Sequence, residues 1–323
     1  MERNYTTQMD AARRGILTPE LETVARKEQM RPEELMPLVA EGKVAIPANR
    51  LHSCLDAQGI GSMLRTKINV NLGVSRDCKD YDVEMEKVRS AVSMGAEAIM
   101  DLSSHGNTQP FRRKLTAECP AMIGTVPVYD SVIHYQRDLD TLSARDFIDV
   151  IRLHAQDGVD FVTLHCGITR KTIDQIRKHK RKMNIVSRGG SLVFAWMCMT
   201  GEENPFYEYY DEILDICREY DVTISLGDAC RPGCLADATD VCQIEELVRL
   251  GELTLGYDIP VQKWCKWIKG LNVSFIGRNL WMLYCKAPFD PETVAGTGTF
   301  SSGIDYFMQP STRNLGFSVK VTF

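Results

Sequence analysis

The chain shows its fold most clearly in one stretch: Asp82-Val-Glu-Met-Glu-Lys-Val-Arg-Ser-Ala-Val-Ser-Met-Gly-Ala-Glu-Ala-Ile-Met-Asp-Leu102. Residues 82–94 have the mixed apolar and charged pattern of an amphipathic helix, and residues 96–102 form a short apolar run. This alternation recurs from Arg65 onward. It predicts six strands, at Lys67–Leu72, Ala96–Leu102, Ala121–Val126, Asp160–His165, Met183–Val186 and Val222–Leu226. Strands that alternate with helices predict a parallel sheet.

Six βα units leave an eight-unit barrel open by two strands. We therefore expect an α/β fold, a partial (β/α)8 TIM-type barrel with six of the eight units, in residues 65–254. A helical N-terminal region is expected in residues 1–64, where Thr18-Pro19-Glu20 has the pattern of a helix start. A β-rich antiparallel tail is expected in residues 255–323.

The composition narrows the class of protein. The 323 residues carry a net charge of −5, so no basic surface suggests nucleic acid. The polar N-terminus has no apolar core of a signal peptide, and no apolar run reaches the roughly 18 residues of a membrane helix. These features predict a cytoplasmic protein. The 11 Cys are then expected to be reduced thiols rather than a disulfide framework.

Residues suited to binding or catalysis follow the predicted strands. In barrels of this type the carboxyl ends of the strands meet on the face that carries the active site. We expect Asn71, Met100, Tyr129, His165 and Asp228 to lie there, together with Ser187, Arg188, Gly189 and Arg231. Ser187-Arg188-Gly189-Gly190 suits an anion, because glycines let backbone N–H groups approach it and Arg adds a charged fork.

Each of these features also has a purely structural interpretation. The glycine turn can be an ordinary strand-to-helix connection, Asp228 and Arg231 can pair within their own loop, and His165 can be a buried structural histidine. A metal site at Cys230, Cys234 and Cys242 has little support, because no further thiol completes a known spacing. His105, His134 and His154 have no partners at metal-ligand spacing. No catalytic residue is assigned.

Six stretches of residues 1–254 belong to one known pattern. Three of them are Arg65-Thr-Lys-Ile-Asn-Val-Asn-Leu-Gly, Asn184-Ile-Val-Ser-Arg-Gly-Gly-Ser and Ser225-Leu-Gly-Asp-Ala-Cys-Arg-Pro-Gly. The others are Asn4-Tyr-Thr-Thr-Gln-Met-Asp-Ala-Ala, Ile99-Met-Asp-Leu-Ser and Ile123-Gly-Thr-Val-Pro-Val-Tyr. With these stretches, residues 1–254 resemble the phosphomethylpyrimidine synthase family of thiamine biosynthesis.

The resemblance implies an atypical radical S-adenosylmethionine enzyme, a lyase that uses a [4Fe–4S] cluster and zinc. It implies conversion of 5-aminoimidazole ribonucleotide to 4-amino-5-hydroxymethyl-2-methylpyrimidine phosphate. It also implies that the nine residues named above contact the substrate. A 5-hydroxybenzimidazole synthase of anaerobic cobalamin synthesis shares substrate and motifs and is kept as an alternative. Whether this chain forms the family's homodimer is left open.

The family's later motifs, a metal-binding Glu-Gly-Pro-Gly-His, a second metal His and Cys-x2-Cys-x4-Cys, are not found here. No His follows His179, and only Cys265 and Cys285 lie beyond Thr254. Without three closely spaced thiolates we expect no stable cluster. The sequence thus predicts a ribonucleotide-binding chain without turnover.

The tail has a different resemblance. Gly277-Arg-Asn-Leu-Trp, Phe289-Asp-Pro-Glu, Gly303-Ile-Asp-Tyr-Phe-Met-Gln-Pro-Ser-Thr-Arg and the terminal Phe323 resemble the end of a starch-utilisation-type TonB-linked outer-membrane receptor. Alternating apolar residues in Leu271–Ile276 and Phe317–Phe323 are typical of its barrel strands. We therefore interpret the chain as a chimera joined near residue 254. A non-catalytic receptor fragment is the alternative function.

Overall fold

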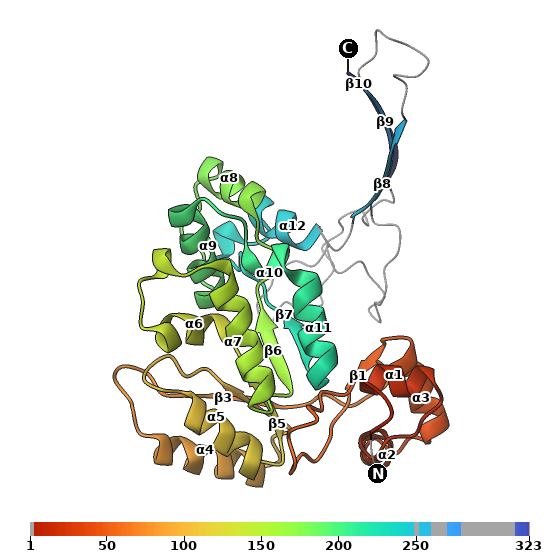
Figure 1. Cartoon of the computed structure of the whole chain (residues 1–323), viewed down its shortest axis with the longest axis vertical. Coiled ribbons are helices and arrows are strands. Elements are labelled where there is room, and N and C mark those ends of the chain that lie inside the picture. The colour runs from red at the N-terminus through yellow and green to blue at the C-terminus, as the bar shows by residue number, and fades with distance from the viewer. Residues whose placement is uncertain (1–2, 249–251, 260–269, 279–313, 323) are drawn as a thin grey trace. The chain divides into compact units, whose positions relative to one another are not determined.

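The computed structural model describes residues 3–248, 252–259, 270–278 and 314–322 (Figure 1). The chain divides into two compact units. One contains Met1–Ile173 and Ser187–Ala229, and the other contains Asp174–Val186 and Cys230–Phe323. Within the described ranges no helix has the length and apolar composition needed to cross a bilayer.

The first unit begins with the expected helical region. Its helices are α1 (Gln8–Arg13), α2 (Pro19–Lys27) and α3 (Pro32–Ala40), followed by the short antiparallel strands β1 (Val44–Ala45) and β2 (Ile60–Gly61). Thr18 is the N-cap of α2, as predicted: its hydroxyl accepts a hydrogen bond from Leu21 N at 3.0 Å. Leu21 and Leu35 bury their side chains completely in the small core between these helices.

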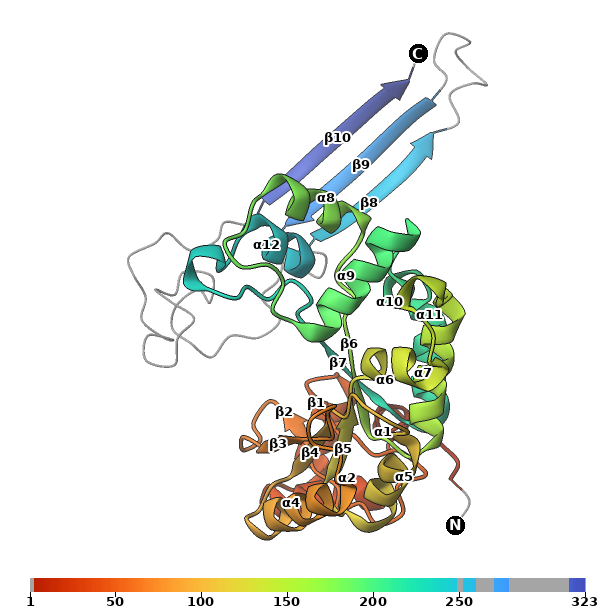
Figure 2. The same ribbon diagram turned by 90° about the vertical axis from the view of Figure 1, so that its left-hand side faces the viewer.

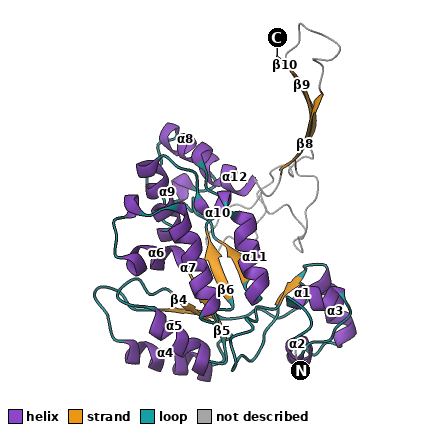
Figure 3. Cartoon of the chain, in the orientation of Figure 1, coloured by secondary structure: helices purple, strands orange, loops and turns teal. Residues whose placement is uncertain are grey.

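A five-stranded parallel sheet forms the centre of this unit. Its strands lie in the order β3 (Asn69–Leu72), β4 (Ala98–Asp101), β5 (Met122–Thr125), β6 (Phe161–Leu164) and β7 (Thr223–Leu226). The helices between them are α4 (Tyr81–Ser93), α5 (Gln109–Glu118), α6 (Pro127–Tyr135), α7 (Ala144–Gln156), α8 (Arg170–Lys178), α9 (Arg188–Thr200), α10 (Pro205–Glu208) and α11 (Tyr210–Tyr220), with a 3-10 turn at Leu139–Thr141. This arrangement is a mixed α/β fold compatible with a partial barrel (Figure 3).

The prediction of a strand at Met183–Val186, the fifth of the six expected along the chain, was wrong. β6 pairs directly with β7 along four residues, from Phe161 with Thr223 to Leu164 with Leu226, which leaves no place for a strand between them. Ile185 instead makes an isolated antiparallel bridge to Pro232. Met183 and Val186 are 51% and 49% exposed. Strands of a parallel sheet are buried on both faces, and these exposed residues are not.

The two faces of the sheet have different environments. Ile99, Ile123 and Val162 point to the helix-covered face and are fully buried. Thr125 on the same face contacts His154 of α7, with 2.8 Å between Thr125 Oγ1 and His154 Nδ1. Residues in register share a face, so Asn71 of β3, Met100 of β4 and Gly124 of β5 lie together on the opposite one.

Aromatic packing places α9 and α10 against α7. The Phe147 ring of α7 lies edge-on to Trp196 of α9, with centroids 5.4 Å apart, and to Phe206 of α10 at 5.9 Å. Trp196 Nε1 also donates to the Leu142 carbonyl at 2.9 Å. Because α9 begins at Arg188, this packing sets where the Ser187–Gly190 turn lies.

The second unit contains a 3-10 turn at Leu235–Asp237, the helix α12 (Val241–Val248) and three strands. Asp237 accepts hydrogen bonds from the backbone N–H groups of Lys182 and Met183, at 2.9 and 2.7 Å. Strands β8 (Glu252–Ile259), β9 (Gly270–Arg278) and β10 (Asn314–Thr322) pair antiparallel in the order β10-β9-β8, the pairing expected for the tail (Figure 2). The motifs Phe289-Asp-Pro-Glu and Gly303–Arg313 lie outside the described residues.

Candidate functional site

Two of the predicted site residues lie side by side at the carboxyl end of the sheet. Asn71 is paired in register with Met100, and Met100 with Gly124. Asn71 is exposed, whereas Met100 is 7% exposed. A Cβ atom built on Gly124 would lie 2.7 Å from Met100 Sδ and 2.1 Å from Phe161 Cζ. Glycine at this position therefore gives both side chains the space over the sheet.

His165 follows β6, and its buried ring lies against the start of α9. The ring Nε2 is 3.0 Å from Ser187 Oγ. A Cβ on Gly189 would lie 2.2 Å from His165 Cε1, and one on Gly227 would lie 2.9 Å from Nε2. The ring thus fits between two glycines from different segments of the chain. Any larger side chain at Gly189 would displace it.

Ser187 also begins α9. Its hydroxyl accepts a hydrogen bond from Gly190 N at 3.2 Å, which makes it the N-cap. Gly190 packs closely on Ala229, since a Cβ there would lie 2.2 Å from the Ala229 carbonyl oxygen. The predicted Ser187-Arg188-Gly189-Gly190 turn is therefore the first turn of a helix, where the backbone N–H groups have no partner within the helix and favour anions.

Arg188 and Tyr129 meet across this end of the unit. The Arg188 guanidinium lies over the Tyr129 ring, 4.9 Å from its centroid, and Arg188 is exposed. Tyr129 is in the first turn of α6, where its N–H donates to the Val126 carbonyl at 3.0 Å. The contact joins two predicted site residues that are 59 positions apart.

A buried polar network supports the α6 turn that carries Tyr129. The next residue, Asp130, accepts hydrogen bonds from Thr108 Oγ1 at 2.6 Å and Arg112 Nη1 at 3.2 Å, and His154 Nε2 lies 3.1 Å from its carboxylate. Burial favours neutral His154 and lowers its pKa to about 4; the charge of Arg112 also lowers it, while Asp130 and Asp157 oppose the shift. The neutral ring can donate from Nε2 to Asp130 and accept from Thr125 at Nδ1.

The remaining two predicted residues, Asp228 and Arg231, belong to different units. Asp228 lies two residues beyond β7 in the first unit, and Gly227 N donates to the Leu164 carbonyl at 2.8 Å, which holds this segment beside β6. Arg231 is exposed and belongs to the second unit. The structure thus gathers Tyr129 with Arg188, His165 with Ser187 and Gly189, and Asn71 with Met100.

Sequence reasoning missed two residues that shape the site. Gly227 leaves room for the His165 ring, and its position directly before Asp228 in the predicted strand-end motif could have indicated it. Asn204 donates hydrogen bonds from its side chain to the carbonyls of His165 and Ile168 in the segment after β6. Its only signal is the Asn-Pro pair with Pro205, which is typical of a helix start but does not indicate a contact with His165.

The comparisons with known proteins identify the family. A sequence profile described as the Radical SAM ThiC family matches residues 7–262.

The chain belongs to this family.

Two relatives named phosphomethylpyrimidine synthase illustrate the similarity. The protein of Clostridium novyi (strain NT) is 60% identical over 251 residues, which cover 78% of this chain and 57% of the relative. That of Pelotomaculum thermopropionicum is 62% identical over 251 residues, covering 78% of this chain and 58% of the relative. The chain therefore matches somewhat more than half the length of these ThiC-family relatives. The profile match runs past Thr254, and the comparisons show no receptor fragment in the tail.

The described residues do not fit the metal cofactors that a radical S-adenosylmethionine family implies. No three His, Cys, Asp or Glu side chains gather in a way that could hold a metal within those ranges. The nine Cys there are free thiols. Burial raises the pKa of Cys230, and it raises that of Cys242 to about 11, so both thiols are protonated near neutral pH. Cys265 and Cys285 lie outside the described residues.

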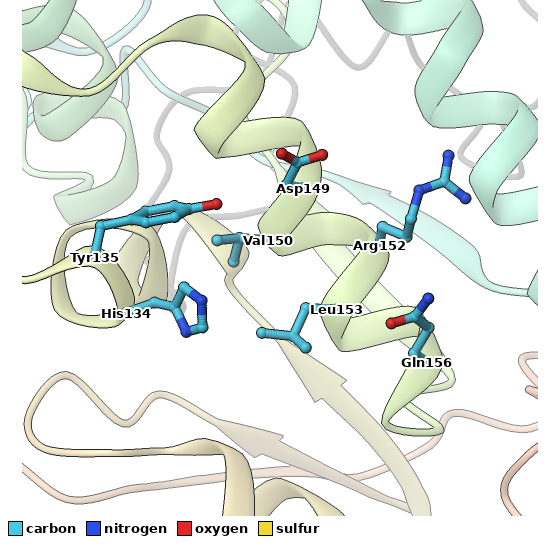
Figure 4. Close-up of a pocket in the computed structure, with 7 residues that line it drawn as sticks. All are labelled: His134, Tyr135, Asp149, Val150, Arg152, Leu153 and Gln156. Carbon is cyan, nitrogen blue, oxygen red and sulfur yellow. The ribbon is translucent and has the colours of Figure 1, made fainter.

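A pocket of about 260 Å³ lies on the helical side of this ThiC-family fold, between α6 and α7 (Figure 4). None of the predicted site residues lines it, so it is separate from the strand-end site. Its lining residues are His134, Tyr135, Asp149, Val150, Arg152, Leu153 and Gln156.

Proposed function

We propose that this chain carries the ribonucleotide-binding part of a phosphomethylpyrimidine synthase. The relatives with that name share about 60% identity with it over 251 residues, and this observation carries the proposal. The proposed ligand is 5-aminoimidazole ribonucleotide. Its proposed contacts in the first unit are Asn71, Met100, Tyr129, His165, Ser187, Arg188, Gly189 and Asp228. Arg231 belongs to the second unit and stays a prediction from the sequence.

The start of α9 is the proposed site of the ribonucleotide phosphate. Ser187 and Gly190 begin the helix, and the exposed Arg188 adds a guanidinium beside that turn. Backbone N–H groups at a helix start and an arginine fork both favour a phosphate. The Tyr129 ring under the Arg188 guanidinium restricts its orientation and supports the same assignment.

His165 is the proposed contact of the heterocyclic part of the substrate. Ser187 holds its ring from one side, and the glycines at 189 and 227 fit against it. An imidazole whose orientation is fixed in this way gives a directional polar contact for a ligand. Asn71, exposed at the end of β3, adds an amide donor and acceptor over the same face.

Turnover is not part of the proposal. The family's chemistry requires S-adenosylmethionine and an iron–sulfur cluster, with zinc expected as well. The described residues gather no set of side chains that could hold these metals. We propose binding without turnover for the chain as it stands, a cytoplasmic location, and the division into residues 1–64, 65–254 and 255–323. The receptor-like origin of the tail stays a prediction from its motifs.

The relatives named above favour the pyrimidine synthase over the 5-hydroxybenzimidazole synthase alternative. Binding of the shared ribonucleotide does not distinguish the two products. Binding therefore tests the proposed ligand, and the pyrimidine product is proposed from the names of the relatives alone.

Calorimetry with 5-aminoimidazole ribonucleotide tests the proposal. A charge-assisted hydrogen bond contributes roughly 1.5–3 kcal/mol, so Arg188→Ala should weaken binding about tenfold or more. The matched control is Arg218→Ala, because Arg218 is also exposed and pairs only with Asp215 among the ion pairs described. The ribonucleoside without phosphate should bind wild type and Arg188→Ala equally. Equal ribonucleotide affinity of all three proteins would remove the phosphate assignment, and no binding to wild type would remove the function.

A further inference from the structure

We propose that Asn204 is a positioning residue that fixes His165 for ligand binding by holding the backbone on which its ring depends. The inference rests on the proposed function, because it assigns His165 to the ligand. It adds a residue that has no contact with the ligand and acts through another side chain.

Both the amide nitrogen and the amide oxygen of the Asn204 side chain make hydrogen bonds. Its Nδ2 donates to the carbonyl oxygens of His165 and Ile168, both at 2.8 Å. Its Oδ1 accepts from Phe206 N at 3.0 Å, which makes Asn204 the N-cap of α10. The residue is fully buried, so water does not compete for these bonds.

The same loop is fastened at a second point nearby. Glu203 accepts a hydrogen bond from Arg170 N at 3.0 Å, and Arg170 Nη1 donates to the Met197 carbonyl at 2.7 Å. The segment after β6 is thus tied to the connection between α9 and α10. Asn204 is the member of this set that bonds directly to the backbone of His165.

Backbone and ring of His165 are held from different directions. Asn204 holds the carbonyl, and Ser187 holds Nε2 of the ring at 3.0 Å. Gly189 and Gly227 leave so little room that a methyl group at either position would meet the ring. A small shift of the His165 backbone therefore has to move the ring away from Ser187 or into one of these glycines.

Asn204→Asp separates the two roles of the side chain. The carboxylate keeps an oxygen for Phe206 N, so the α10 cap survives. It replaces the two donated bonds by an acceptor facing two carbonyl oxygens, which repel it. The variant therefore releases the His165 backbone and leaves the cap in place.

Asn49 provides a matched control within the same chain. It is also buried, its Nδ2 donates to the carbonyls of Ala155 and Val159, both at 2.8 Å, and its Oδ1 accepts from Leu51 N at 2.9 Å. These contacts precede β6, whereas His165 follows it. Asn49→Asp therefore carries the same chemical change at the opposite end of the strand.

The experiment compares the two variants in the full chain. NMR of the chain with 15N-labelled histidine follows the ring signals without ligand, and His165→Gln assigns the His165 signals. We expect Asn204→Asp to shift the His165 ring signals and leave those of His154 unchanged, whereas Asn49→Asp leaves those of His165 unchanged. Calorimetry should show at least a tenfold loss of ribonucleotide affinity for Asn204→Asp and less than a twofold loss for Asn49→Asp.

The two measurements separate the inference from the function on which it rests. Unchanged His165 ring signals in Asn204→Asp would overturn the positioning role, as would equal losses of affinity in the two variants. A wild-type chain that binds no ribonucleotide would refute the proposed function, and the ring signals would still decide whether Asn204 positions His165. If Asn204→Asp does not fold, Asn204→Gln displaces the same amide by one methylene, and wild-type ring signals in that variant would overturn the inference.

Discussion

Ser187 Oγ lies 3.0 Å from Nε2 of His165, and the same hydroxyl accepts the N–H of Gly190 at 3.2 Å. A hydroxyl has one proton and two lone pairs, so it can make both contacts at once. One serine therefore begins α9 and fixes the orientation of a buried imidazole. This couples the helix that carries Arg188 to the segment directly after β6 that carries His165.

Ser187→Ala should lower the free energy of unfolding by about 1 kcal/mol, because it removes the N-cap of α9. Ser187→Thr keeps a hydroxyl and should lose less. Urea denaturation of the three proteins measures the difference. An alanine variant as stable as wild type would show that the cap contributes nothing to stability.

Gly189→Ala should lower the free energy of unfolding by about 1–3 kcal/mol, since its Cβ would lie 2.2 Å from His165 Cε1 and overpack the site. If the ring is the cause, the same substitution should cost clearly less in a His165→Ala background. Denaturation of the two single variants and the double variant completes the cycle. Additive losses would place the cause elsewhere.

Asp221 should make the first unit less stable as the pH rises. Burial raises the pKa of Asp221 to about 6 from its usual 3.8, although the ion pair with Arg3 and the N–H of Gln8 oppose the shift. A raised carboxyl pKa means that the fold prefers the protonated form. Its contribution is complete below pH 3.8 and is lost as the pH rises to 6, by at most about 3 kcal/mol.

Asp221→Asn isolates this effect. Asparagine tolerates the left-handed backbone of residue 221, whose φ is 61°, and does not titrate. The stability of wild type relative to the variant should fall between pH 4 and 6.5, measured by urea midpoints at each pH. A constant difference across that range would contradict the assignment.

His154 should have the opposite pH dependence. Because burial lowers its pKa to about 4, the fold prefers the neutral ring, and its contribution is present above pH 6.5 and lost as the pH falls toward 4. The expected loss is about 3 kcal/mol relative to His154→Gln, which can still contact Asp130 and Thr125. NMR titration checks the prediction directly, since the His154 ring should stay neutral at pH 5. Protonation of the His154 ring near pH 6.5 would show that burial does not lower its pKa.

Part of the candidate site could be predicted from the sequence because its residues follow strands whose pattern is local. Five of the six predicted strands are present, and Asn71, Met100 and His165 lie at or directly after the strands that predicted them. The apolar run at Met183–Val186 has the same composition as a strand but stands outside the sheet, because β6 and β7 pair with each other. The composition of a segment does not indicate whether a neighbouring strand has a free edge with which it can pair.

The sequence by itself determined the alternation of helices and strands, the start of α2 at Thr18 and the family motifs, because side-chain patterning and capping act over a few neighbouring residues. Only the tertiary structure decided that Arg188 lies over Tyr129 and that Asn204 holds His165. These pairs are 59 and 39 positions apart, and their contact depends on how α6, α9 and α10 pack on the rest of their unit. Such packing follows from burial summed over many side chains, which no short motif records.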